Sequence, residues 1–179
     1  MLLDQYGLVV DLHKDFINSG AEAITLNSYT ITPDRLKKFN LEDSFKPLQE
    51  SAIKAAKEAI NSFSKSAGIL LLGSLPPLVM SYKTELGKNK KEAKDIYKRI
   101  VEIQQQHVDI FVCETVSSIE EAEVVTEVAL GSEKKVWLSF CVKEVDGTQL
   151  RSGESLEDAL TQFENTEINS FLVNCSPPE

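Results

Sequence analysis

The sequence is poor in the two residue types that most often build disulfide frameworks and metal sites. Its 179 residues include three cysteines and two histidines. The cysteines, Cys113, Cys141 and Cys175, are widely spaced and odd in number, and none belongs to a CxxC pair. This pattern argues against a disulfide scaffold and a self-contained zinc finger, and it is typical of a reducing compartment. We therefore expect a cytoplasmic protein.

Long apolar runs and an excess of positive charge are also absent. No run approaches the roughly 18 apolar residues of a membrane helix, and the first residues lack the basic and apolar segments of a signal peptide. The formal net charge is −9, and residues 114–179 hold 14 acidic and 4 basic side chains. A basic run over residues 83–99 is interleaved with acidic side chains, which is typical of a solvated helix face. We expect no membrane and no nucleic-acid partner, because phosphate backbones repel such a surface.

The eight glycines are scattered and form neither of the common phosphate-binding loops. The absence of G-x-G-x-x-G and G-x-x-x-x-G-K-[S/T] argues against a nucleotide-binding doubly wound domain. The chain instead alternates short apolar runs with segments of helical periodicity. The runs span residues 23–26, 68–73, 108–113, 136–142 and 171–173. Continuous apolar strands of this length are typical of a covered parallel sheet, and the alternation predicts an α/β fold.

Capping signals mark where the helices begin and end. Gly20 suits the left-handed position that closes a helix, because a side chain there would be strained. Serine and acidic residues at capping-box spacing predict helix starts within residues 117–121 and at residues 155–158.

Polar residues after the predicted strands favour a barrel over an open sheet. Asn27, Ser74, Glu114 and Asn174 are each placed just past the carboxyl end of an apolar run. In a (β/α)8 barrel these ends converge on one mouth, where the chemistry takes place. A complete barrel takes about 250 residues and eight strands, so we expect residues 1–179 to form a single incomplete barrel domain of about five parallel strands. Its open sheet edges favour a homo-oligomer, because an unpaired edge invites another chain.

Five motifs, in order along the chain, resemble those of the homocysteine S-methyltransferase family. Residues 13–29 resemble its H-x-x-F/Y-I-x-A-G-A-D-x-I-x-T-N-T/S-Y segment, and residues 73–79 are similar to its A-G-S-L-x-P turn. Residues 109–115 resemble D-x-x-x-x-E-T, residues 136–140 match V-W-x-S-F, and residues 173–175 correspond to V-N-C. The resemblance covers essentially the whole chain and implies strands 2–6 of a TIM (β/α)8 barrel.

The resemblance also implies a chemistry and a set of partners. The family transfers a methyl group from a sulfonium, ammonium or folate donor to homocysteine, whose thiolate binds a zinc ion held by three cysteines. Cys175 matches one zinc ligand, but the G-G-C-C motif with the other two and the first-strand D-G-G-M/L-G-T motif have no counterpart here. We therefore expect neither zinc binding nor activity from this chain alone. Glu114 matches the ammonium-binding carboxylate, and Asn27, Ser74 and Asn174 are expected along the substrate pocket.

Two other functions are compatible with the same residues. One is a metal-free α/β enzyme in which Glu114 acts as an acid or base, and the other is a non-catalytic half-barrel that dimerises through its open sheet edges. A carboxylate at position 114 can also cap the next helix or face solvent. Cys113 and Cys141 lie inside apolar runs, so we expect them to be buried hydrophobic residues and not ligands.

Overall fold

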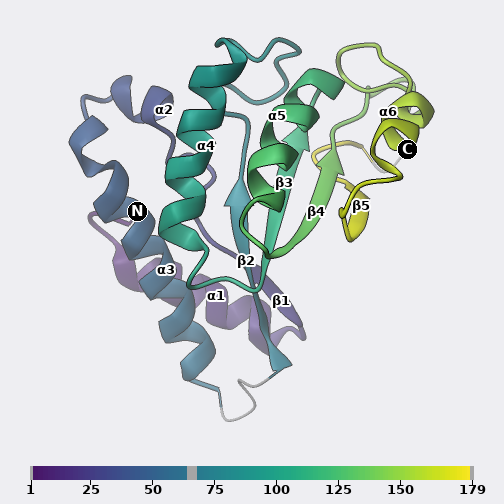
Figure 1. Cartoon of the computed structure of the whole chain (residues 1–179). Helices are drawn as coiled ribbons and strands as arrows, with labels where there is room; N and C mark the ends of the chain where they lie inside the picture. Colours follow the sequence, from purple (N-terminus) through teal and green to yellow (C-terminus); the bar gives the residue numbers. More distant parts are fainter. Residues whose placement is uncertain (1, 64–67, 178–179) are drawn as a thin grey trace.

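The computed structural model of the chain describes residues 2–63 and 68–177. Five parallel strands form one sheet, and their order in space is their order in the sequence (Figure 1). They are β1 (Ala23–Thr25), β2 (Leu70–Leu75), β3 (Ile110–Val116), β4 (Lys135–Phe140) and β5 (Ser170–Val173). A doubly wound sheet reverses its strand order at a switch point, whereas successive neighbours are the arrangement of a (β/α)8 barrel. The predicted α/β fold with five parallel strands of a partial barrel is confirmed.

Helices connect the strands, and α3, α4 and α5 lie side by side over one face of the sheet (Figure 1). The helices are α1 (Tyr6–Asn18), α2 (Pro33–Lys37), α3 (Phe45–Asn61), α4 (Lys90–Gln104), α5 (Ile119–Leu130) and α6 (Leu156–Phe163), with a 3-10 turn η1 (Glu42–Ser44) before α3. Gly20 has φ +98° just after α1, as predicted. Ser118 and Ser155 are the N-caps of α5 and α6, where their hydroxyls accept backbone N–H groups three residues ahead.

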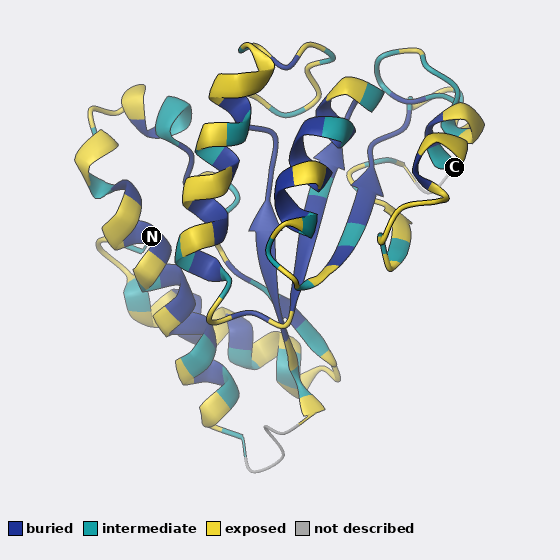
Figure 2. Cartoon of the chain, in the orientation of Figure 1, coloured by how far each residue is buried: buried dark blue, intermediate teal, exposed yellow. Residues whose placement is uncertain are grey.

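The two faces of the sheet carry different hydrophobic clusters. Alternate residues such as Leu71, Phe111 and Leu138 pack under the helices in the main core, which Figure 2 shows as the buried interior. The intervening residues Leu72, Ile110 and Val112 form a smaller cluster on the opposite face, with Ala23 and Trp137 against it. We call this second face the inner face. Because side chains alternate along a strand, Ser74, Glu114 and Ser139 belong to the inner face as well.

A buried network of two glutamines ties the helices to the sheet. Gln104, at the end of α4, accepts the Ser74 N–H at 3.1 Å and donates to Gln49 Oε1 at 2.8 Å and Ser28 Oγ at 3.3 Å. Gln49 Nε2 in turn donates to the Ile31 carbonyl at 2.9 Å. Removing one partner would leave several buried polar groups unpaired, each at a cost of about 1–3 kcal/mol. The network therefore fixes β2 and the segment after β1 against α3 and α4.

Each strand's bounds differ slightly from the predicted run, and two of these differences move predicted site residues into strands. β2 and β3 extend to Leu75 and Val116, so Ser74 and Glu114 lie inside strands and not just past their ends. The polar side chains are accommodated there because Ser74 Oγ donates to Glu114 Oε1 at 2.5 Å. The pairing of β3 with β4 is irregular between Cys113 and Val116, which is the signature of a bulge. In β3 the run of hydrophobic residues ends at residue 113, whereas the hydrogen-bonded strand continues to Val116.

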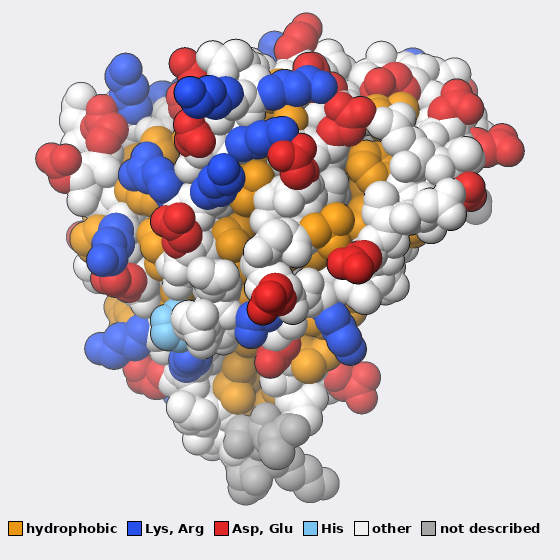
Figure 3. Space-filling view, viewed as in Figure 1, with side chains coloured by type: hydrophobic (Ala, Val, Ile, Leu, Met, Phe, Trp, Pro, Cys, Tyr) orange, Lys and Arg blue, Asp and Glu red, His pale blue; other side chains and the backbone are white. Residues whose placement is uncertain are grey.

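The surface over α4 and α5 is charged and mixed in sign (Figure 3). Lys90 Nζ lies 3.0 Å from Glu123, and Lys94 Nζ lies 2.6 Å from Glu127. These pairs join the two helices across solvent, so the basic run is the solvated helix face that was predicted. No helix within residues 2–63 and 68–177 is both long and apolar enough to cross a bilayer.

The sheet has two open edges among the described residues. β1 pairs only with β2, and β5 pairs only with β4. At the β5 edge the apolar side chains of Phe171, Leu172 and Val173 are 37%, 38% and 53% exposed. A strand edge of this kind is a template for pairing with further backbone.

A buried carboxylate lies at the start of α5. Glu121 Oε2 accepts the Ser117 N–H at 3.0 Å, and its side chain is buried against the main core. Burial raises the pKa of Glu121 from 4.5 to about 7, against the opposing effects of the Ser117 hydrogen bond and the Arg35 charge. The folded state therefore holds a proton on Glu121 that the unfolded chain releases at lower pH.

We predict that Glu121→Gln removes a pH-dependent loss of stability. As pH rises from about 4.5 to about 7, the unfolded carboxyl ionises first, so the wild-type chain loses on the order of 3 kcal/mol from this group. The loss is absent below the unfolded pKa and complete above the folded pKa. Urea denaturation across this range should give a flatter profile for Glu121→Gln than for the wild type. Glu120→Gln, at an exposed neighbouring position, is the matched control, and an equal flattening in both variants would contradict the prediction.

Candidate functional site

A carboxylate and a hydroxyl form a hydrogen-bonded pair on the inner face, near the carboxyl ends of the strands. Glu114 is half-buried and Ser74 is fully buried, and their side chains are joined by the 2.5 Å hydrogen bond. Burial raises the pKa of Glu114, and the Ser74 hydrogen bond opposes that rise. A carboxylate held in this way has lost part of its water and can gain from a cationic ligand. The structure thus brings together two of the predicted pocket residues.

Asn174, which directly follows β5, connects the ends of three strands. Its Oδ1 accepts the Thr115 N–H of β3 at 2.9 Å and the Ser139 hydroxyl of β4 at 2.9 Å. Its Nδ2 donates to Thr115 Oγ1 at 3.1 Å and contacts Cys175 Sγ at 3.6 Å. Asn174 therefore holds Thr115 and Cys175 in place at the carboxyl ends of β3, β4 and β5.

Cys175 is the exposed thiol of the three, and its backbone is in the left-handed region with φ 52°. Thr115 has φ 61° and donates to Cys175 Sγ at 3.5 Å. Tyr82 has φ 64°, and a hydrogen bond with Cys175 raises its pKa. Non-glycine residues in this region cost about 1–3 kcal/mol each and are found at sites where the surroundings hold them. Because Thr115 and Tyr82 both lie against Cys175, the surroundings of this thiol form a candidate site.

The other two cysteines are buried, as predicted. Cys113 packs in the main core, where burial raises the pKa of its thiol well above its ordinary value. Cys141 contacts the backbone of Cys175. Its Sγ donates to the Cys175 carbonyl at 3.2 Å and accepts from Arg151 Nε at 3.4 Å. It is therefore a buried thiol with polar partners and not only a small hydrophobic residue.

Asn27 takes no part in this group of side-chain hydrogen bonds. It is exposed, and none of the side-chain hydrogen bonds found in residues 2–63 and 68–177 involves it. It lines a different cavity of about 380 Å³ at the β1 edge, beside Leu12, His13 and Phe16 of α1. Thr25, two residues before Asn27, pairs with Leu72, two residues before Ser74.

The described residues do not by themselves fit a zinc ion. Zinc sites use three or four protein ligands from cysteine, histidine and carboxylate side chains. In the described part of the chain, no group of three such residues is close enough to hold a metal. Cys175 alone offers an exposed thiol, and Cys141 is already engaged by Arg151 and by the Cys175 carbonyl.

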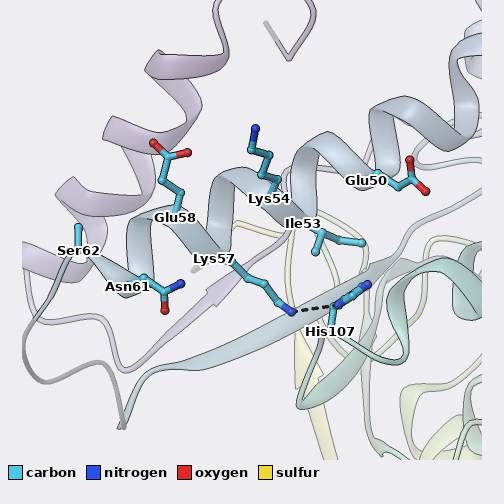
Figure 4. A pocket seen from close by; sticks show the side chains of 8 residues that line it. All are labelled: Glu50, Ile53, Lys54, Lys57, Glu58, Asn61, Ser62 and His107. Carbon is cyan, nitrogen blue, oxygen red and sulfur yellow. Dashed lines mark hydrogen bonds between the residues drawn. The ribbon is translucent and has the colours of Figure 1, made fainter.

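A second cavity, of about 680 Å³, lies along α3 and is not part of this site. It is lined by Glu50, Lys54, Lys57 and His107, and Lys57 Nζ lies 3.0 Å from His107 Nδ1 (Figure 4). Burial and the Lys57 charge lower the pKa of His107. His107 precedes β3, so this cavity lies at the amino ends of the strands, the end of such barrels that serves stability.

Two functional positions were not identified from the sequence. Thr115 and Ser139 both bond to Asn174, although neither stood out beside the charged and thiol residues. The signal for Ser139 was available, because it alternates with Leu138 and shares the inner face with Trp137 near the end of β4. The left-handed backbone of Thr115 has no signal in sequence, since threonine rarely adopts it.

Comparison with known proteins agrees with this architecture. The family model described as homocysteine S-methyltransferase matches residues 1–179. The chain is 28% identical to homocysteine S-methyltransferase 2 of Arabidopsis thaliana over 96% of its own length and 59% of that protein. It is 29% identical to betaine-homocysteine S-methyltransferase of Drosophila melanogaster over 84% of the chain and 51% of that protein.

A solved structure shows the same fold. The metallated form of the homocysteine methyltransferase MmuM from Escherichia coli superposes with a TM-score of 0.82 at 20% identity, covering 97% of this chain and 65% of that protein. The chain thus spans about three fifths of the length of the first of these relatives. With the family motifs in order along a partial barrel, the chain belongs to the homocysteine S-methyltransferase family.

Proposed function

We propose that this chain carries part of the homocysteine site of a homocysteine S-methyltransferase. The whole protein would transfer a methyl group from a sulfonium, ammonium or folate donor to the sulfur of homocysteine. The observation that carries the proposal is the arrangement of Glu114, Ser74 and Cys175 near the carboxyl ends of the strands. Asn174 and Thr115 connect the thiol to the strand that bears the carboxylate.

The side chains suit the two ends of homocysteine. The ammonium group of the amino acid would pair with Glu114, whose pKa is raised by burial and would be lowered again by a bound cation. Ser74 holds the carboxylate by donating to Oε1. The sulfur of the ligand would then point toward Cys175. The names of the relatives, which include homocysteine and betaine-homocysteine methyltransferases, support this choice of substrate.

We further propose that Cys175 is a metal-ligand position that needs ligands from outside these 179 residues. The metallated form of the related Escherichia coli enzyme supports a metal in the family. Self-association through the open β1 and β5 edges, and residence in the cytoplasm, stay predictions.

The proposed substrate site is tested by homocysteine binding to Glu114→Gln. A charge-assisted hydrogen bond contributes about 1.5–3 kcal/mol, so the variant should bind homocysteine at least about tenfold more weakly in isothermal titration calorimetry. Glu167→Gln makes the same change of charge at an exposed position and should bind like the wild type. Equal affinity in all three proteins would rule out Glu114 as the ammonium-binding group.

The proposed metal dependence on further ligands is tested by elemental analysis of the purified chain. After dialysis against a zinc-free buffer, we expect far less than one zinc ion per chain, because a single thiolate is a poor site. The zinc content of Cys175→Ser should equal that of the wild type within the error of the measurement. Stoichiometric zinc that Cys175→Ser abolishes would show that the chain completes a site by itself, against this proposal.

A further inference from the structure

A cavity beside Cys175 is not accounted for by the homocysteine ammonium site. It has a volume of about 500 Å³ and is lined by Tyr82, Glu144, Arg151, Cys175 and Pro177. Tyr82 comes from the loop between β2 and α4, and Glu144 and Arg151 come from the segment between β4 and α6. These loops follow the carboxyl ends of strands, where barrels of this class place their ligands.

Arg151 is held firmly at this cavity. Its Nε donates to Cys141 Sγ at 3.4 Å, and its backbone N–H donates to the Cys141 carbonyl at 3.1 Å. The guanidinium group lies over the Tyr82 ring, 4.9 Å from its centre. Only 21% of the Arg151 side chain is exposed. A stacked and anchored guanidinium loses little further freedom when it binds a ligand.

Among residues 2–63 and 68–177, the terminal nitrogens of Arg151 have one weak partner. Both Nη1 and Nη2 donate to the same oxygen of Glu144, each at 3.3 Å. Charge-assisted hydrogen bonds are usually about 2.7–2.9 Å, and a bidentate pair uses both carboxylate oxygens. The Glu144 side chain is 68% exposed, and exposed pairs contribute only about 0–1 kcal/mol. A ligand carboxylate can therefore displace Glu144 at small cost.

We propose that Arg151 binds the carboxylate of an α-amino-acid ligand in this cavity. The inference rests on the proposed function and names the group that recognises the acid end of homocysteine or of an amino-acid methyl donor. Arg151 lines this cavity together with Cys175, and its Nε donates to Cys141, whose thiol donates to the Cys175 carbonyl. Thr115, the residue after Glu114 in the chain, donates to the Cys175 sulfur. Glu114 would thus bind an ammonium group, and Arg151 would bind a carboxylate group.

The test is isothermal titration calorimetry of this chain and its variants with four ligands. Homocysteine and S-methylmethionine carry the carboxylate, and 3-aminopropane-1-thiol and (3-aminopropyl)dimethylsulfonium lack it. Arg151→Gln should weaken binding of the ligand that carries the carboxylate at least about tenfold. Its affinity for the analogue without a carboxylate should be unchanged. The amino acid that loses affinity identifies the source of the carboxylate. Arg99→Gln is the matched control, because Arg99 is also stacked on an aromatic ring, 4.7 Å from the centre of Phe45. It should change the affinity for none of the four ligands.

Glu144→Gln gives an opposite and independent signal. It removes the competing carboxylate from an exposed position, so affinity for the carboxylate ligand should rise about twofold or more. This variant keeps the test decisive if Arg151→Gln lowers the melting temperature, because an exposed glutamine there should not unfold the chain.

Each contrary result has a defined meaning. The inference is wrong if Arg151→Gln weakens the binding of an amino acid and of its analogue equally. It is also wrong if Glu144→Gln lowers the affinity for the carboxylate ligand. If Arg151→Gln changes nothing while Glu114→Gln weakens homocysteine, the inference fails and the proposed function stands. If the unaltered chain binds neither amino acid, the inference and the proposed substrate site fail together.

Discussion

The side-chain amide of Asn174 is the interaction on which the candidate site depends. One short side chain accepts from β3 and β4 and donates back to Thr115, so it fixes the relative positions of three strand ends. It does so at the residue directly before Cys175, whose thiol it contacts. Because Glu114 precedes Thr115 in the chain, the same amide also sets where the carboxylate stands relative to the thiol. An alanine there would leave a backbone N–H and a hydroxyl without this partner.

The buried glutamines give the other half of the sheet a comparable support. Gln104 accepts the Ser74 N–H and reaches Gln49 and Ser28, so the strand that carries the serine partner of Glu114 is tied to α3 and α4. The site therefore has an amide anchor on each side of Glu114. Strained backbone at Thr115 and Cys175 is tolerated within this frame, since its hydrogen bonds determine those conformations.

The fold could be predicted from the sequence because its determinants are local. Apolar runs and capping residues 155–158 indicate strands and a helix start within a few neighbouring positions. The site was harder, since its partners are distant: Ser74 and Glu114 are 40 residues apart, and Thr115 and Asn174 are 59 apart. Periodicity says which face a residue belongs to but not which side chain it meets.

Two positions show where sequence reasoning stopped. Asn27 fits the family motif and lines a cavity beyond the end of β1, beside α1, so its place in the substrate pocket stays a prediction. Arg151 was passed over, because a lone arginine in a polar loop has no distinctive pattern. Its significance appears only when Tyr82, Cys141 and Glu144 are seen around it.

The central claim is that Glu114, Asn174 and Cys175 belong to one homocysteine-binding site. It is tested most directly by titrating the ¹⁵N-labelled chain with homocysteine and mapping the amide chemical shifts. We expect the amides of Ser74, residues 114–115 and residues 174–175 to shift together with a single affinity. Shifts confined to the cavity around Lys57 and His107, or no shift at the carboxyl ends of the strands, would contradict it.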